Sequence, residues 1–398
     1  MSTTENREFA LVAACCLWPP SPVRNESIAS AAAGAIDWAR FLRVVKRHRV
    51  PGLVWNGLLE AGIDAPTDIV RTLKAGAGRT ARASLASCAE AIRLQRLFEQ
   101  AGLACAFLKG ATVAKLAYDD LGIRHAKDID MVVPDAAFFA ACDLLASAGY
   151  RRTKPAGPAT KTQLALWRRH GKDMEWWHDD KRIELELHWR LSSFSFLFKE
   201  PTDFARLYPV QVIPGAALTT LPQPDLFIYL CAHGASHAWC RLKWLADINA
   251  LVAGRPAEAI EAYYQAAKDR SADRPVGQAL SLCVRLFGLQ LPQSVAADLS
   301  RSPAIPLLTR IALHAMIRGG AETEIHDLRF GTTLIGLSHL LMTKSWRESF
   351  FEALRHSINL EDTIALPLPK SLSFLYVLLR WPLWLCRRFS NAGASIAK

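Results

Sequence analysis

Residues 105–133 decide the fold, and they read CAFLKGATVAKLAYDDLGIRHAKDIDMVV. The first residues are apolar and end at the dipeptide Lys109-Gly110, after which Ala111 to Tyr118 show a helical pattern of apolar positions. An apolar run, a glycine and an amphipathic segment in direct succession predict a strand, a tight turn and a helix. A second short apolar run closes the stretch, which predicts a second strand at residues 128–133.

This second predicted strand carries two acids, Asp128 and Asp130. Because side chains alternate along a strand, both carboxylates point to one face while Ile129 and Met131 point to the other. Carboxylate oxygens are hard ligands for Mg²⁺ or Mn²⁺, the ions that hold phosphates in phosphoryl and nucleotidyl transfer. The pattern therefore predicts a divalent-cation site on this strand.

A third acid lies in residues 182–189, which read RIELELHW. The alternation predicts a strand whose apolar residues face a core and whose polar residues Glu184, Glu186 and His188 share the opposite face. Residues 173–178 are expected to pair with it as a hairpin. Either glutamate could complete a triad of carboxylates, and strand alternation does not separate them. His188 is expected to hydrogen-bond a carboxylate or a phosphate.

Several blocks of sequence, in this order, resemble the nucleotidyltransferases of the DNA polymerase β superfamily. More narrowly, they resemble a bacterial branch of largely uncharacterised nucleotidyltransferases, and the match extends from about Trp38 to the end of the chain. The blocks are Lys109-Gly110, Arg124, Asp128-x-Asp130, Glu186-x-His188-Trp189-Arg190, and the segment 231–252, CAHGASHAWCRLKWLADINALV.

The resemblance implies an α+β fold: a polymerase β-like core of a small mixed sheet with helices, flanked by helical N-terminal and C-terminal regions. It also implies that Gly110 opens a phosphate-facing turn, that Asp128 and Asp130 ligate the metals, and that Glu186 is the third carboxylate. Two departures stand out. Ala111 follows Gly110 where the superfamily commonly has Ser or Gly, so Lys109 and backbone N–H groups must do more of the phosphate binding. Glu186 is one methylene longer than the usual Asp.

Further cations are candidates for nucleotide binding. Arg124 is expected to pair with Asp128 or with a phosphate oxygen. Arg241 and Lys243 lie on a predicted helix over the cleft, where they either meet the triphosphate or form a solvated basic face. The full predicted nucleotide-binding set is Lys109, Gly110, Ala111, Arg124, Arg241 and Lys243.

His233 and His237 are four residues apart in a predicted helix, 224–238, and would share one face. Such a pair could bind zinc, but Gly234 stands where the Glu of an H-E-x-x-H motif would be. Structural histidines, or histidines that approach the nucleotide or the acceptor, are favoured over a metal site.

Composition sets wider limits. The 398 residues are 51% hydrophobic and 21% charged, as in a folded protein, and the net charge of +11 favours anionic partners: nucleotides, nucleic acid or an anionic membrane. Nine cysteines without a C-x-x-C pair indicate free thiols in a reducing cytoplasm. The N-terminus does not resemble a cleaved signal, and no apolar run reaches the roughly 18 residues of a membrane-spanning helix.

The patterns predict three regions: a helical region at 1–100, an α/β core at 101–220, and a helical domain at 221–398, with a cleft at their junction. Residues 372–388 are strongly apolar and lead into Arg387-Arg388. This segment is expected to be a buried closing helix, with peripheral contact to the inner face of the membrane as the alternative. Other predicted helices span 53–60, 66–100, 135–147, 257–268, 276–287, 305–317 and 331–341.

These expectations together predict a metal-dependent nucleotidyltransferase. It would move a nucleoside monophosphate from an NTP to an acceptor and release pyrophosphate, using Asp128, Asp130 and Glu186 as catalytic residues and metal ligands. A small metabolite, a peptide or protein side chain, an RNA end and a polysaccharide precursor all remain possible acceptors. The alternatives are a nucleotide-binding regulatory module with little catalysis and a membrane-associated partner protein.

Overall fold

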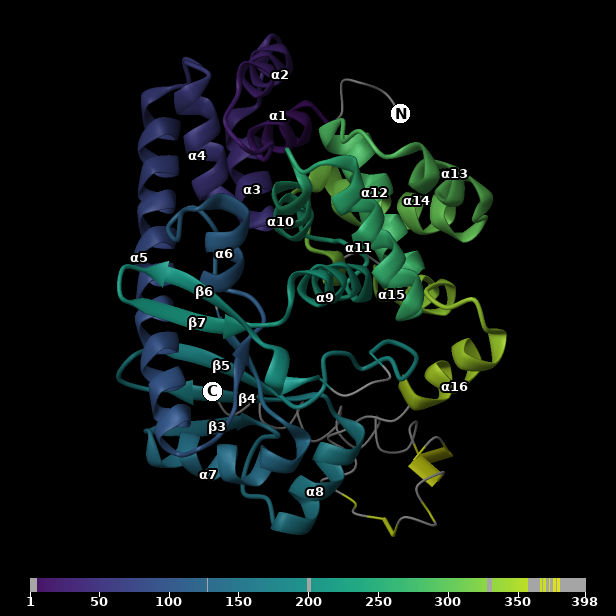
Figure 1. Cartoon of the computed structure of the whole chain (residues 1–398). Coiled ribbons are helices and arrows are strands. Elements are labelled where there is room, and N and C mark those ends of the chain that lie inside the picture. The colour runs from purple at the N-terminus through teal and green to yellow at the C-terminus, as the bar shows by residue number, and fades with distance from the viewer. Residues whose placement is uncertain are drawn as a thin grey trace, which may run out of the picture.

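A five-stranded mixed sheet carries the predicted acids. Its strands lie in the order β1 (Ala106–Phe107), β2 (Asp128–Val132), β5 (Ile183–His188), β4 (Asp173–His178) and β3 (Tyr150–Lys154) (Figure 1). Strand β2 runs parallel to β5, and every other neighbouring pair is antiparallel. The predicted α+β fold and the predicted hairpin of β4 and β5 are confirmed.

The coordinates are those of a computed structural model. It describes residues 6–126, 128–198, 202–327 and 331–356, and near the C-terminus residues 366, 368, 369, 372, 375, 376, 378 and 379. The predicted apolar segment 372–388 therefore lies largely outside the described residues.

The helices of the core follow the strands closely. Helix α6 (Ala111–Tyr118) begins at Gly110, whose φ of 70° is the left-handed value that glycine adopts without strain. Helix α7 (Phe138–Ser147) follows a short 3-10 turn at Asp135–Ala137, and α8 (Lys161–His170) begins with a capping box on Thr160. Helix α7 packs on the apolar face of the sheet, against Met131 and Leu187, and leaves the acidic face uncovered by this layer.

Five helices precede the sheet: α1 (Arg7–Cys15), α2 (Pro22–Ala32), α3 (Trp38–His48), α4 (Pro51–Glu60) and α5 (Thr67–Gln100). The Asp37 side chain accepts a hydrogen bond from the Arg40 N–H and so caps α3, as its position suggests. Helix α5 is continuous through its two glycines and runs along one side of the molecule (Figure 1).

A hairpin that the sequence patterns did not predict joins the core to the C-terminal helices. It consists of β6 (Tyr208–Ile213) and β7 (Ala216–Thr220). The Thr220 hydroxyl donates to the Phe107 carbonyl at 2.6 Å, and the Thr219 hydroxyl donates to the Cys105 carbonyl at 2.8 Å. These bonds hold the hairpin beside β1.

The C-terminal region is helical, as predicted, and its helices share one apolar core with the N-terminal helices, in which Leu11, Val44, Leu245 and Leu280 are fully buried. Its helices are α9 (Gln223–Ser236), α10 (Leu242–Val252), α11 (Ala257–Asp269), α12 (Asp273–Phe287), α13 (Gln293–Arg301), α14 (Ala304–Ile317), α15 (Gly331–Leu341) and α16 (Trp346–His356).

Two of the wider expectations can be compared with the described residues. No helix among the described residues is both long enough and apolar enough to cross a membrane. All eight described cysteines are buried free thiols. The cytoplasmic location and the three domain boundaries stay predictions.

Candidate active site

The register of β2 and β5 brings the predicted acids together. Asp128 pairs with Glu184, and Asp130 pairs with Glu186. Residues that face each other on neighbouring strands point to the same side of a sheet, so four carboxylates occupy one face. The third acid therefore lies on the same side of the sheet as the first two.

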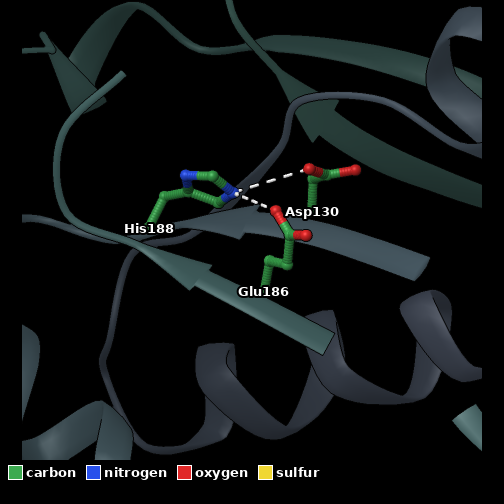
Figure 2. Close-up of side chains that lie close together, drawn as sticks. All are labelled: Asp130, Glu186 and His188. Carbon is green, nitrogen blue, oxygen red and sulfur yellow. Dashed lines mark ion pairs between the residues drawn. The ribbon is translucent and has the colours of Figure 1, made fainter. Parts of the chain in front are cut away.

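Three side chains on this face come close enough to share an ion: Asp130, Glu186 and His188 (Figure 2). His188 Nε2 lies 3.5 Å from Asp130 Oδ1 and 3.3 Å from Glu186 Oε2. One potential ligand atom from each residue lies within 4.8 Å of the others. Asp130 and His188 are buried, whereas the Glu186 side chain is 24% exposed.

Lys109 is the counter-charge of this cluster. Its Nζ lies 2.6 Å from Asp130 Oδ1, and both side chains are nearly buried. Burial alone would raise the pKa of Asp130, but the Lys109 charge and the His188 ring outweigh it and hold that pKa well below its usual range. Burial likewise opposes the charge on Lys109, yet Asp130 keeps the pKa of the amine raised. Asp130 is therefore ionised.

Asp128 has the opposite shift. Burial raises the pKa of this carboxyl, and the neighbouring charge of Asp130 raises it further. Two carboxylates one residue apart on a strand repel each other, and a divalent cation between them would remove that repulsion. The predicted metal-binding trio of Asp128, Asp130 and Glu186 differs here from the tightest cluster, in which His188 replaces Asp128.

The donor set fits a divalent cation. Asp130 Oδ1 is ion-paired with Lys109, whereas both ring nitrogens of His188 are buried without a hydrogen bond of normal geometry to the described residues. Buried polar atoms of this kind need a partner. Carboxylate oxygens suit Mg²⁺ and Mn²⁺, and an imidazole nitrogen is tolerated better by Mn²⁺ than by Mg²⁺.

Strand β4 supplies polar neighbours that the sequence reasoning did not single out. Asp173 faces His188 in the register, with Oδ2 3.9 Å from His188 Nδ1, and Lys172 pairs with Asp173. Glu175 faces Glu186 and pairs with Lys154 at 3.1 Å. The sequence does contain a signal for these acids: Asp173 and Glu175 alternate with the buried Met174 and Trp176, which predicts that both acids lie on the polar face of the strand.

The pKa of His188 reflects these contacts. Burial and then the charge of Lys172 lower the pKa of the ring, but the carboxylates of Asp130 and Glu186, both within 3.5 Å, and the charge of Asp173 outweigh them and raise it.

The Lys109-Gly110 turn leaves the start of α6 open for an anion. No side chain caps this helix. The Thr112 hydroxyl donates back to the Lys109 carbonyl at 3.1 Å, which fixes the turn. Free N–H groups at a helix N-terminus attract phosphate, and the phosphate-binding role of Gly110 and Ala111 stays a prediction.

Arg124 has a different partner from the one predicted. Its guanidinium contacts both carboxylate oxygens of Asp247 on α10, with Nε 3.0 Å from each and NH2 2.9 Å from Oδ2. Tyr118 donates a further hydrogen bond to Asp247 at 3.0 Å. The predicted pairing with Asp128 is wrong, because the guanidinium is buried and forms its ion pair with Asp247 of α10 instead.

The two other predicted cations also lie on or beside α10. Arg241 pairs with Glu324 at 2.9 Å and donates to the Arg47 carbonyl. Lys243 is buried and makes no hydrogen bond or ion pair with any residue that the structure describes. The alternative of a solvated basic face is therefore wrong for both.

The electrostatics place Lys243 near Asp128. Burial and then the charge of Arg124 lower the pKa of its amine to about 7, although the negative charge of Asp128 opposes this shift.

His233 lies in α9, and His237 is the residue that follows its last turn. Their ring centroids are 4.9 Å apart, and both rings pack against Trp244. Burial and then the Lys109 charge lower the pKa of both rings, that of His237 to about 4, so both are neutral. Within the described ranges no third ligand completes a metal site around them. The structural reading is thus favoured over zinc.

Comparison with known proteins agrees with this geometry. The sequence model of a family described as uncharacterised nucleotidyltransferase matches residues 34–288. A comparison with curated proteins found no match. The matched range covers more than half of the chain and includes the whole sheet, the acidic face, the Lys109-Gly110 turn and α10. The chain therefore belongs to this uncharacterised nucleotidyltransferase family.

Proposed function

We propose that this protein transfers a nucleoside monophosphate from an NTP to an acceptor hydroxyl or phosphate, with release of pyrophosphate. One observation carries the proposal: Asp130 and Glu186 face each other on adjacent parallel strands, with His188 within 3.5 Å of both, beside an open helix N-terminus. Nucleotidyl transfer needs carboxylates that hold a divalent cation next to a phosphate-binding turn.

The carboxylates of Asp128, Asp130 and Glu186, with the His188 ring, would hold Mg²⁺ or Mn²⁺. When bound there, the cation supplies positive charge to the phosphates and lowers the pKa of the acceptor hydroxyl.

The chain's own groups have separate roles in the reaction. Lys109 and the first N–H groups of α6 bind the phosphates that leave as pyrophosphate. The partly exposed carboxylate of Glu186 accepts the proton of the acceptor hydroxyl, and His188 holds that carboxylate in place. Lys243 adds a cation beside Asp128 when a phosphate enters, because an anion favours its charged form.

A labelling experiment tests the proposal. The full-length protein is incubated with each α-labelled NTP and Mg²⁺ or Mn²⁺, with and without cell lysate. We expect the wild type to transfer label to a protein, an RNA or a small molecule. The double variant Asp128→Asn plus Asp130→Asn should lose transfer, because neutral amides hold a divalent cation poorly. Equal labelling by both proteins would refute the site. Nucleotide binding without any transfer by the wild type would favour a regulatory module instead.

A further inference from the structure

Two neighbouring helices, α3 and α5, carry a group of exposed cations. The first half of α5 carries four exposed cations, and none of them forms an ion pair within the described part of the chain: Arg71, Lys74, Arg79 and Arg82. Helix α3, which packs against α5, adds Lys46, which is exposed and likewise has no acidic partner among the described residues. Such a cluster of uncompensated cations attracts anions.

A cavity of about 490 Å³ lies between α3 and α5. Its cations are Arg43, Lys46, Arg49 and Arg79, and its apolar lining includes Leu42 and Leu73. Among the residues described, no acid lines it, although Arg43 is partly neutralised by Glu322. A volume of this size lies within the usual range for small organic ligands.

The cavity adjoins the acidic strand. His125, three residues before Asp128, forms part of its wall. Arg49 forms another part of the wall. Burial and the charge of Arg241 lower the pKa of Arg49, and the charge of Asp128 opposes this lowering, so Arg49 lies within electrostatic range of Asp128. The cavity thus borders the segment that leads into the acidic strand β2.

The backbone at Arg49 is in an unusual conformation. The residue ends α3 with φ 57° and ψ 46°, the left-handed conformation that usually belongs to glycine. The conformation directs the chain from α3 into α4 with the guanidinium half-buried beside the cavity.

We propose that the cavity between α3 and α5 is the acceptor subsite, and that it binds a small organic phosphate through Lys46, Arg49 and Arg79. The inference rests on the proposed function and names the class of its acceptor. The apolar lining favours an organic phosphate over a bare ion. A second groove, of about 920 Å³, lies on another face of α5, and its lining includes Arg71, Lys74 and the acid Asp120. An extended polyanion would cover this groove as well as the cavity, whereas a small organic phosphate would bind in the cavity alone.

Phenyl phosphate is a suitable probe, because it joins a phosphate to an apolar body. Its binding to the full-length protein is measured by isothermal titration at low ionic strength with EDTA, so that the metal site takes no part. We expect the wild type to bind, and we expect binding at least about tenfold weaker in Lys46→Ala plus Arg79→Ala, because this double variant removes two charge-assisted hydrogen bonds to the phosphate. The matched control, Arg71→Ala plus Lys74→Ala, removes the same charge from the same region and should bind like the wild type.

Three outcomes would overturn the subsite: no binding by the wild type, equal weakening in both double variants, or displacement of phenyl phosphate by metal-free ATP. Displacement would assign the cavity to the nucleotide. The same titration is repeated with an RNA oligonucleotide instead of phenyl phosphate. If both double variants weaken RNA binding equally, these cations form a surface for polyanions and not a subsite. Label transfer is measured separately, so its failure with phenyl phosphate binding intact would count against the proposed function and not against the cavity.

Discussion

Glu186→Gln is expected to slow nucleotidyl transfer by roughly 10²–10⁴-fold, the usual contribution of a group that takes a proton in the reaction. Glutamine keeps the size of the side chain and removes its charge, so neither the cation nor the acceptor proton is held as before. The measurement is the initial rate of label transfer at saturating NTP.

Glu184→Gln is the matched control. Glu184 lies on the same strand and the same face, but it pairs with Asp128 and is absent from the tight cluster with His188. Its substitution should leave the rate close to that of the wild type. A larger loss in Glu184→Gln than in Glu186→Gln would move the third carboxylate to the Asp128 side of the site.

Asp247→Ala is expected to lower the free energy of unfolding by about 3–5 kcal/mol, because it leaves the buried Arg124 charge without its partner. Arg124 and Asp247 side chains are only 4% and 2% exposed, so water cannot replace the lost contacts. Tyr118 also loses its hydrogen-bond acceptor. Urea denaturation followed by circular dichroism measures the change.

The double variant Arg124→Met plus Asp247→Leu separates charge from packing. It removes both charges and keeps apolar volume, so it should recover part of the lost stability. If Asp247→Ala unfolds at the same urea concentration as the wild type, the ion pair does not hold α10 to the core.

Strand alternation was enough to place the acids on faces, but it could not say which strands are neighbours. Asp128, Asp130, Glu184 and Glu186 were all correctly expected on polar faces. That Glu186 lies opposite Asp130 follows from the parallel pairing of β2 with β5, which joins segments about fifty residues apart in sequence. Non-local pairings of this kind leave no local signal in the chain.

The Arg124 pairing shows the same limit. Arg124 and Asp247 are 123 residues apart, and each belongs to a motif that appears complete without the other. The β6–β7 hairpin was a different kind of omission. Alternating Val210 and Val212, followed by Pro214-Gly215, are an ordinary hairpin signal that the sequence reasoning passed over.

The basic cavity required the structure for its recognition. The net charge of +11 predicted an anionic partner without locating it. Arg79 lies near the middle of a long helix and Lys46 lies in another, and only their packing brings both to the wall of one cavity.

Binding of Mn²⁺ tests the central claim most directly. Mn²⁺ is titrated into the full-length protein, and the free ion is followed by its electron paramagnetic resonance signal. The account predicts that the wild type binds Mn²⁺ and that Asp130→Asn binds it at least about tenfold more weakly. Asp143→Asn, which changes an exposed acid of α7 on the other side of the sheet, should bind like the wild type. Equal Mn²⁺ affinity in the wild type and Asp130→Asn would contradict the account.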